Sequence, residues 1–182
     1  MKVRASLPLA SWIRPAIWLM PEDNTYGGFP ASGEIDLMES SGNENYHCGQ
    51  QSRGVDTVQT NLHFGPAGIN PHWKNETLKS NSSANYAEQF HIYEIDWTEQ
   101  YLAFLIGKTR PDTSQTRPIN VLSSDGSEIY RLTAPGPDGG LWHYAGYSGD
   151  NIYKHGGPLA PFDQPFYFIL SAQSGETCPD LT

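Results

Sequence analysis

Hydrophobic residues recur along the chain in short alternating or apolar runs, and no run has the spacing of a long amphipathic helix. The alternation is clearest in residues 90–97, where His91, Tyr93, Ile95 and Trp97 share one face of the expected strand. The pattern therefore predicts an all-β protein, with strands at residues 2–7, 16–20, 34–39, 57–63, 90–97, 101–106, 129–132 and 166–171. Residues 98–100 are a short turn, so the fifth and sixth of these strands are expected to form a hairpin.

The intervals between the strands are polar and rich in residues that favour turns. The chain has 18 glycines and 14 prolines, which recur between the runs as they do between short strands. Three intervals, residues 21–32, 66–86 and 133–165, are expected to be long loops. Because long loops on a β scaffold often carry binding groups, and these contain several aromatic residues, they are candidates for ligand contacts.

The size and charge of the chain narrow the classes of function. With 182 residues and no internal repeat or linker, residues 1–182 are expected to form a single domain and a monomer. The net charge of −9, with only 11 Lys and Arg residues, argues against a nucleic-acid partner. No apolar run is long enough to cross a membrane, and no signal peptide opens the chain, so the protein is either cytoplasmic or lacks its N-terminus.

Two further features bear on the cellular compartment. Asn75 and Asn81 each begin a glycosylation sequon within a polar stretch, which is typical of an extracellular surface loop. Cys48 and Cys178 are too widely spaced to resemble a zinc site, and the sequence leaves open whether they form a disulfide.

The run GEIDLME at residues 33–39 carries the most informative chemistry. Glu34 and Asp36 are two residues apart, so they project from the same face of a strand. Strict alternation would turn Glu39 towards the opposite face, which holds apolar residues. A β-bulge that adds one residue, either Leu37 or Met38, would return Glu39 to the acidic face.

Three carboxylates on one face repel one another, and catalysis explains them better than surface charge does. A retaining glycosidase needs two carboxyl groups about 5–5.5 Å apart, one as nucleophile and one as general acid and base. Glu34 and Glu39 suit these roles, and Asp36 between them would help to separate their pKa values. A calcium site is the structural alternative, although calcium loops are irregular and rich in Gly, Asn and Asp.

The same heptapeptide resembles the signature of glycoside hydrolase family 16, and the extra residue before Glu39 resembles its laminarinase branch. Residues 12–21, 29–33, 62–66 and 90–98 are similar, in order and rough spacing, to animal β-1,3-glucanases and β-1,3-glucan-binding proteins. The resemblance extends to about residue 170. It implies a concanavalin A-like jelly-roll sandwich of two antiparallel sheets, with a β-1,3-glucan cleft across the concave face.

The resemblance also implies roles for individual residues. Glu34 would be the nucleophile, Asp36 the assisting acid and Glu39 the general acid and base of a retaining endo-β-1,3-glucanase. Substrate contacts are expected from the following side chains: Trp18, Trp12, Phe29, His63 and Arg4. No cofactor or catalytic metal is expected, although full-length relatives often hold a structural calcium ion. Secretion is expected from the family and from the sequons.

The ends of the chain depart from the family pattern. Strands that precede Lys2 in relatives are absent, and the sequence after about residue 170 lacks the Asn- and Gly-rich segment expected there. The domain is therefore expected to be incomplete at the N-terminus, atypical at the C-terminus and less stable than a full domain.

Three other functions compete with hydrolysis. A non-catalytic β-1,3-glucan-binding protein of innate immunity would share the fold, but binding-only relatives have typically replaced one or both glutamates. A transglycosylase would use the same carboxylates with a sugar as acceptor. An inactive truncated fragment is the third alternative. The intact Glu34, Asp36 and Glu39 favour hydrolysis.

Overall fold

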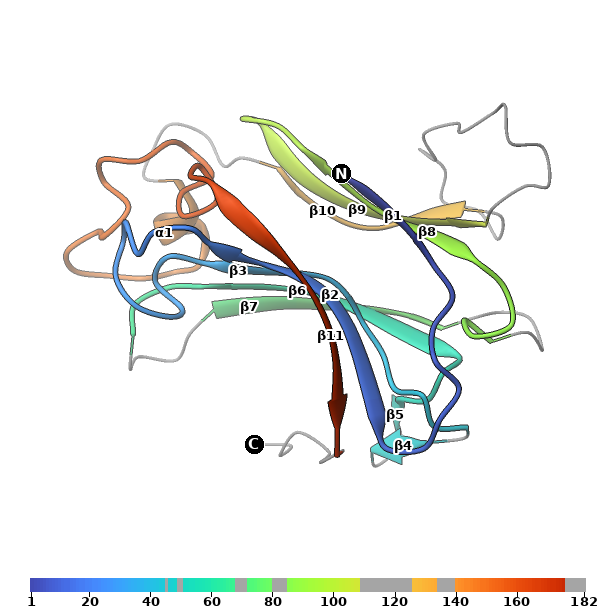
Figure 1. The fold of residues 1–182 in the computed structure, drawn as a ribbon. Helices are drawn as coiled ribbons and strands as arrows, with labels where there is room; N and C mark the ends of the chain where they lie inside the picture. The colour runs from blue at the N-terminus through green and yellow to red at the C-terminus, as the bar shows by residue number, and fades with distance from the viewer. Residues whose placement is uncertain are drawn as a thin grey trace.

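The computed structural model describes residues 1–44, 46–48, 51–67, 72–79, 85–108, 126–133 and 140–175. Within them the chain forms a sandwich of two antiparallel sheets (Figure 1). One sheet has the strand order β1-β8-β9-β10, with β1 at Lys2–Ala5, β8 at His91–Trp97, β9 at Tyr101–Lys108 and β10 at Gly126–Thr133. The other has the order β11-β2-β3-β6-β7, with β11 at Phe166–Ser174, β2 at Ile13–Pro21, β3 at Glu34–Glu39, β6 at Thr57–Phe64 and β7 at His72–Lys79.

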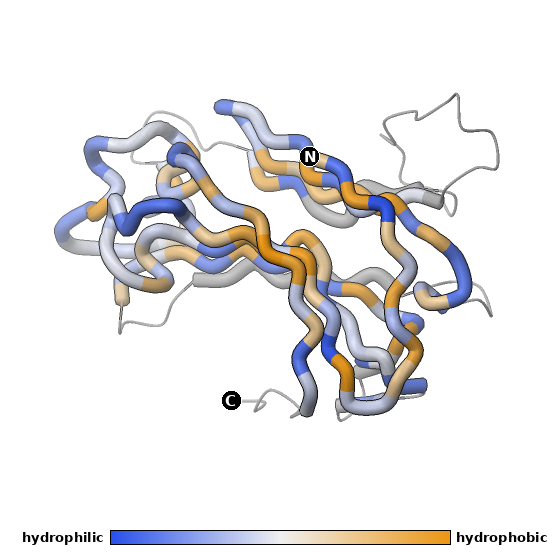
Figure 2. The backbone as a smooth tube through the Cα atoms, in the orientation of Figure 1, coloured by the Kyte–Doolittle hydropathy of each residue, from blue (hydrophilic) through white to orange (hydrophobic). Residues whose placement is uncertain are grey.

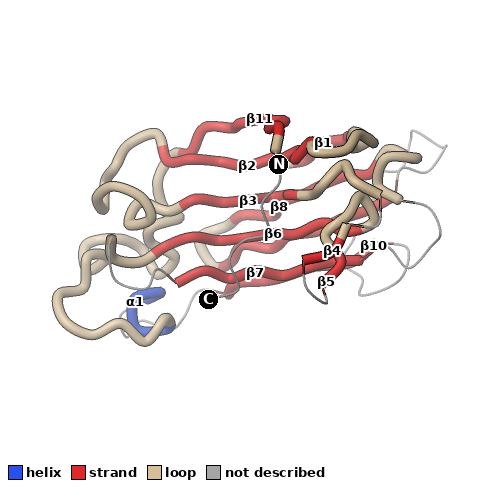
Figure 3. Tube along the Cα trace, turned by 90° about the horizontal axis from the view of Figure 1, so that it is seen from below, coloured by secondary structure: helices blue, strands red, loops and turns tan. Residues whose placement is uncertain are grey.

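The remaining elements are small. Strands β4 (His47–Cys48) and β5 (Gln51–Ser52) form a separate two-stranded sheet, and α1 (Gly140–Tyr144) is a five-residue helix. Figure 3 shows α1 and the neighbouring loops at one end of the sandwich, with the β4–β5 hairpin towards the other end. No helix among the described residues is long and apolar enough to cross a membrane.

The core lies between the two sheets, where alternate residues of their strands face each other. Tyr93 and Ile95 on β8 are each 1% exposed, and Ile35 and Leu62 on the facing sheet are fully buried. In Figure 2 hydrophobic segments lie along the strands of both sheets, and most hydrophilic segments lie in the connections. The face that His91, Tyr93, Ile95 and Trp97 were expected to share is therefore the one that points inwards.

All eight expected strands are present, with modest differences in their ends, and the hairpin at residues 98–100 joins β8 to β9. Two of the expected loops contain regular structure. Strand β7 lies within residues 66–86, where the polar run HWKNETLK gave no apolar face to detect, and α1 lies within residues 133–165. Asn75 belongs to β7, opposite Asn61, and thus lies in a strand instead of a loop. Asn81 and Cys178 lie outside the described residues, and Cys48 ends β4.

Candidate active site

Strand β3 carries the acidic row and lies in the middle of the five-stranded sheet, between β2 and β6. Ile35, Leu37 and Met38 are at most 2% exposed and point into the core. Glu34, Asp36 and Glu39 therefore project from the opposite face of the sheet. The strand has a hydrogen-bonded neighbour on each side, so the carboxylates lie in the interior of the sheet and not at its edge.

The predicted β-bulge is confirmed, and Leu37 is the extra residue. On β2, Ile17 pairs with Met38 and the next residue, Trp18, pairs with Asp36, so Leu37 has no partner. The pairing with β6 shifts at the same place, between Asp36 and Glu39. Both Leu37 and Met38 consequently turn inwards, and Glu39 returns to the acidic face.

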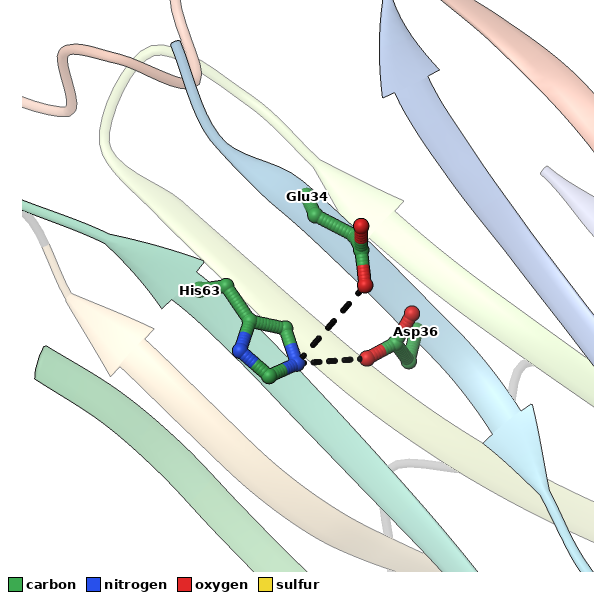
Figure 4. A group of neighbouring side chains, drawn as sticks. All are labelled: Glu34, Asp36 and His63. Carbon is green, nitrogen blue, oxygen red and sulfur yellow. Dashed lines mark hydrogen bonds and ion pairs between the residues drawn. The ribbon is translucent and has the colours of Figure 1, made fainter. Parts of the chain in front are cut away.

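Asp36 is the most deeply buried of the three acids, and His63 on β6 is its partner. The residue is 4% exposed, and its Oδ2 lies 3.0 Å from Nε2 of His63. The same nitrogen lies 3.8 Å from Oε1 of Glu34. Figure 4 shows the imidazole edge facing both carboxylates. His63, which was expected as a substrate contact, thus lies beside the acidic row.

Glu39 is held from two sides by residues that the sequence analysis did not select. Arg14 on β2 donates from Nη2 to Oε1 of Glu39 at 2.6 Å, and Asn61 on β6 donates from Nδ2 to Oε2. Both carboxylate oxygens thus have a donor, which fixes the side-chain orientation. Alternation along β2 and β6 places Arg14 and Asn61 on the acidic face, but their pairing with Glu39 depends on strand register.

The environment raises the pKa of Glu34 to about 7. Burial is the main cause, and the negative charge of Asp36 adds to it, whereas the nearby His63 opposes the shift. A carboxyl group with this pKa keeps its proton well into the range where exposed glutamates are ionised.

Glu39 also has a raised pKa, because burial and the charge of Asp36 outweigh the opposing effect of Arg14. Burial lowers the pKa of His63. The hydrogen bond to Asp36 and the charges of the three acids raise this pKa by more than burial lowers it, so the net shift is upwards. Closely spaced acids in partial burial resist complete ionisation, so we expect the row to retain a proton near neutral pH.

Two of the aromatic candidates lie beside this group. Trp18 is directly opposite Asp36 in the β2–β3 pairing, and its Nε1 donates to Oγ of Ser171 on β11 at 3.1 Å. Phe29, in the loop before β3, is 56% exposed, and its ring centroid lies 5.9 Å from that of His63. Both rings are therefore placed to contact a ligand on the acidic face.

Arg4, another substrate-contact candidate, is not brought to the acidic row. Arg4 is on β1 of the opposite sheet, where its exposed guanidinium lies 3.9 Å from the ring centroid of Phe90. Trp12 lies in the turn before β2 and is 57% exposed. A missed aromatic candidate is Tyr167 on β11, which is 51% exposed and pairs with Met20 on β2.

Chemically, the acidic face can supply both a nucleophile and a proton donor. Ionised Glu34 can attack an electrophilic carbon, and protonated Glu39 can give its proton to a leaving oxygen. The neighbouring rings offer apolar surfaces of the kind on which sugar rings stack. A β-sandwich with a row of three acids beside aromatic side chains is the arrangement of a glycoside hydrolase.

Comparison with known proteins identifies the family within that class. Residues 1–122 match glycosyl hydrolases family 16, and the chain belongs to this family. It is 34% identical over 181 residues to a beta-1,3-glucan-binding protein of Penaeus monodon, a match that covers 97% of this chain and 42% of the relative. It is 27% identical to glucan endo-1,3-beta-glucosidase A1 of Niallia circulans, with 94% of this chain and 19% of the relative covered. The chain thus spans less than half the length of these two relatives.

A solved structure supports the fold assignment. The catalytic domain of an endo-1,3-beta-glucanase (laminarinase) from Thermotoga petrophila aligns with a TM-score of 0.60 and 24% identity, covering all of this chain and 56% of the other. The predicted jelly-roll β-sandwich is confirmed. The roles of the individual site residues stay predictions.

Proposed function

We propose that this chain is part of a retaining endo-β-1,3-glucanase of the laminarinase type. The observation that carries the proposal is the bulge at Leu37, which places Glu34, Asp36 and Glu39 on one face of β3. Membership of glycosyl hydrolases family 16 and the resemblance to proteins named as glucan endo-1,3-beta-glucosidases support the substrate class.

The proposed reaction has two displacements. In the first, an ionised oxygen of Glu34 bonds to the anomeric carbon while Glu39 gives its proton to the departing glycosidic oxygen. In the second, Glu39, now a carboxylate, takes a proton from water, and the resulting hydroxide oxygen displaces Glu34 from the sugar. Asp36, which is hydrogen-bonded to His63, lies beside both glutamates, and its charge raises the pKa of each.

The substrate would lie across the acidic face of the five-stranded sheet. Trp18 and Phe29 would stack against pyranose rings, and His63 would contact the sugar nearest the cleaved bond. We propose no required cofactor. We propose that the protein acts outside the cell, on the basis of its family and its sequons.

The principal alternative is β-1,3-glucan recognition without hydrolysis. Its support is the 34% identity to a protein named as a beta-1,3-glucan-binding protein. Against it stands the complete acidic row, because a protein that only binds glucan has no need of three partly buried, mutually repelling carboxyl groups.

The test is release of new reducing ends from laminarin by the purified chain, with product lengths followed by chromatography. We expect Glu34→Gln and Glu39→Gln to abolish release, whereas Glu22→Gln, a change at an exposed glutamate just after β2, should leave it unaltered. Release that survives both site substitutions would show that other residues carry the reaction. Laminarin binding without release would support the recognition alternative.

A further inference from the structure

Three side chains of the acidic face converge in a way that suits a metal ion as well as a sugar. Glu34 and Asp36 on β3 and His63 on β6 each offer a ligand atom, and these atoms lie within 4.8 Å of one another. Among the described residues, no other group of three His, Cys, Asp or Glu side chains has ligand atoms this close together. Figure 4 shows Nε2 of His63 directed at both carboxylates, which is the orientation that coordination by this nitrogen requires.

The distances suit a small dication. In a tetrahedral zinc site with bonds of about 2.1 Å, two ligand atoms lie about 3.4 Å apart. Nε2 of His63 lies 3.0 Å from Oδ2 of Asp36 and 3.8 Å from Oε1 of Glu34, values on either side of that spacing. Small side-chain rotations would therefore bring all three atoms to bonding distance of one ion.

The charge and accessibility of the group also favour a cation. Glu39 adds a third acid to the same face. The ion pair of Arg14 is with Glu39 and not with Glu34 or Asp36. The side chains of Glu34 and His63 are 19% and 25% exposed, so an ion can reach them from solvent. Asp36, at 5%, would form the inner wall of the site.

We propose that Glu34, Asp36 and His63 bind one Zn²⁺ ion per chain, with solvent at the remaining position. One imidazole with two carboxylates is a donor set that zinc accepts readily. Calcium and magnesium prefer oxygen ligands alone, whereas His63 offers a nitrogen, which zinc binds well. The proposal does not require the chain to hydrolyse glucan.

One consequence does rest on the proposed function. A zinc ion bonded to Glu34 occupies the oxygen that would attack the sugar, and it stands where the ring of the substrate would lie. Zinc should therefore inhibit hydrolysis competitively with laminarin, and a chelator should restore the rate.

Zinc titration by calorimetry tests the site directly on the purified chain. We expect one ion per chain and an affinity at least about tenfold lower in His63→Asn, because one of three protein ligands is lost. His155→Asn, a change at an exposed loop histidine, should bind zinc as the unmodified chain does. Absence of saturable binding, or equal affinity in His63→Asn, would overturn the proposal.

Cobalt gives a second measurement that needs no variant. Co²⁺ bound by this donor set should show the visible absorption of a four-coordinate ion, and Zn²⁺ should remove it whereas Ca²⁺ and Mg²⁺ should not. A spectrum identical to that of Co²⁺ in buffer would overturn the site, and displacement by Ca²⁺ would overturn the choice of metal. A chain that binds zinc but releases no reducing ends even after zinc is removed with a chelator would refute the proposed hydrolysis alone. Hydrolysis by a chain that does not bind zinc would refute the metal site alone.

Discussion

Arg14 and Glu39 form an ion pair between neighbouring strands of the five-stranded sheet, with Nη2 and Oε1 2.6 Å apart. Asn61 donates to the other oxygen of Glu39 from the opposite side. The carboxyl group proposed as general acid is therefore held by two donors, one of them positively charged. Arg14 favours the ionised form of Glu39, but burial and the charge of Asp36 favour the protonated form more strongly.

Replacing Arg14 by Gln should extend activity to higher pH. The positive charge of Arg14 lowers the pKa of Glu39, so its removal raises that pKa, and the general acid stays protonated further into the basic range. The measurement is the pH profile of kcat/KM for laminarin. The falling limb at high pH should move upwards in Arg14→Gln, and Arg14→Lys should keep it near its original place. A falling limb that does not move in Arg14→Gln would mean that Arg14 has no influence on the general acid.

Replacing Glu34 by Gln should abolish activity and stabilise the fold at neutral pH. The pKa of Glu34 is about 7 in the folded protein and near 4.5 when exposed, so its protonated form stabilises the fold below about pH 4.5. That contribution is lost as the pH rises towards 7 and beyond. The amide of Gln does not ionise, so it avoids this loss.

Thermal unfolding between pH 5 and 8 measures this effect. The Tm of the unmodified chain should fall across that range, and the Tm of Glu34→Gln should fall less. The difference between the two Tm values should therefore grow by a few degrees, which corresponds to about 1 kcal/mol in a chain of this size. Glu22→Gln, at an exposed position, is the control and should follow the unmodified chain. Parallel Tm curves for Glu34→Gln and the unmodified chain would show that the Glu34 carboxyl ionises without cost to the fold.

The sequence was sufficient to predict strand β3 and its bulge, because the period of two in a strand makes one misplaced acid conspicuous. The family resemblance also pointed to His63 and Trp18, which lie on β6 and β2 beside the acidic row. Arg14 and Asn61 were missed because the local sequence pattern does not specify the register between neighbouring strands. Register decides which residues of β2 and β6 lie beside Glu39.

A local sequence pattern also does not show to which of the two sheets a strand belongs. Arg4 was expected at the cleft, but β1 pairs with β8, so Arg4 belongs to the sheet that faces away from the acidic row. Strand β7 was missed because its sequence, HWKNETLK, is mostly polar and shows no apolar alternation, although its backbone pairs with β6.

Trp18 and Trp12 should respond differently to truncation. Trp18 lies opposite Asp36, where its ring can stack on the sugar, whereas Trp12 lies in the turn before β2. We expect Trp18→Ala to raise KM for laminarin by about tenfold, which corresponds to about 1.4 kcal/mol of lost binding, and Trp12→Ala to change it less than twofold. Steady-state kinetics on both variants measures this. A larger effect of Trp12→Ala would place the glucan near the start of β2 instead of over the acidic row.

Strand β11 should promote self-association, because among the described residues it is an edge strand of the five-stranded sheet, and its sequence, FYFILSAQS, contains no charged residue or proline. Natural edge strands usually carry such residues, which prevent pairing with other chains. Leu170 pairs with the buried Ile17 and faces the same side, yet it is 64% exposed.

We expect Leu170→Lys to reduce self-association, measured by light scattering and sedimentation at increasing concentration, with little change in Tm. Leu9→Lys, at a position 52% exposed outside any strand, adds the same charge and is the control. Equal improvement by both variants would trace the effect to net charge, and no improvement by Leu170→Lys would show that the edge of β11 does not pair.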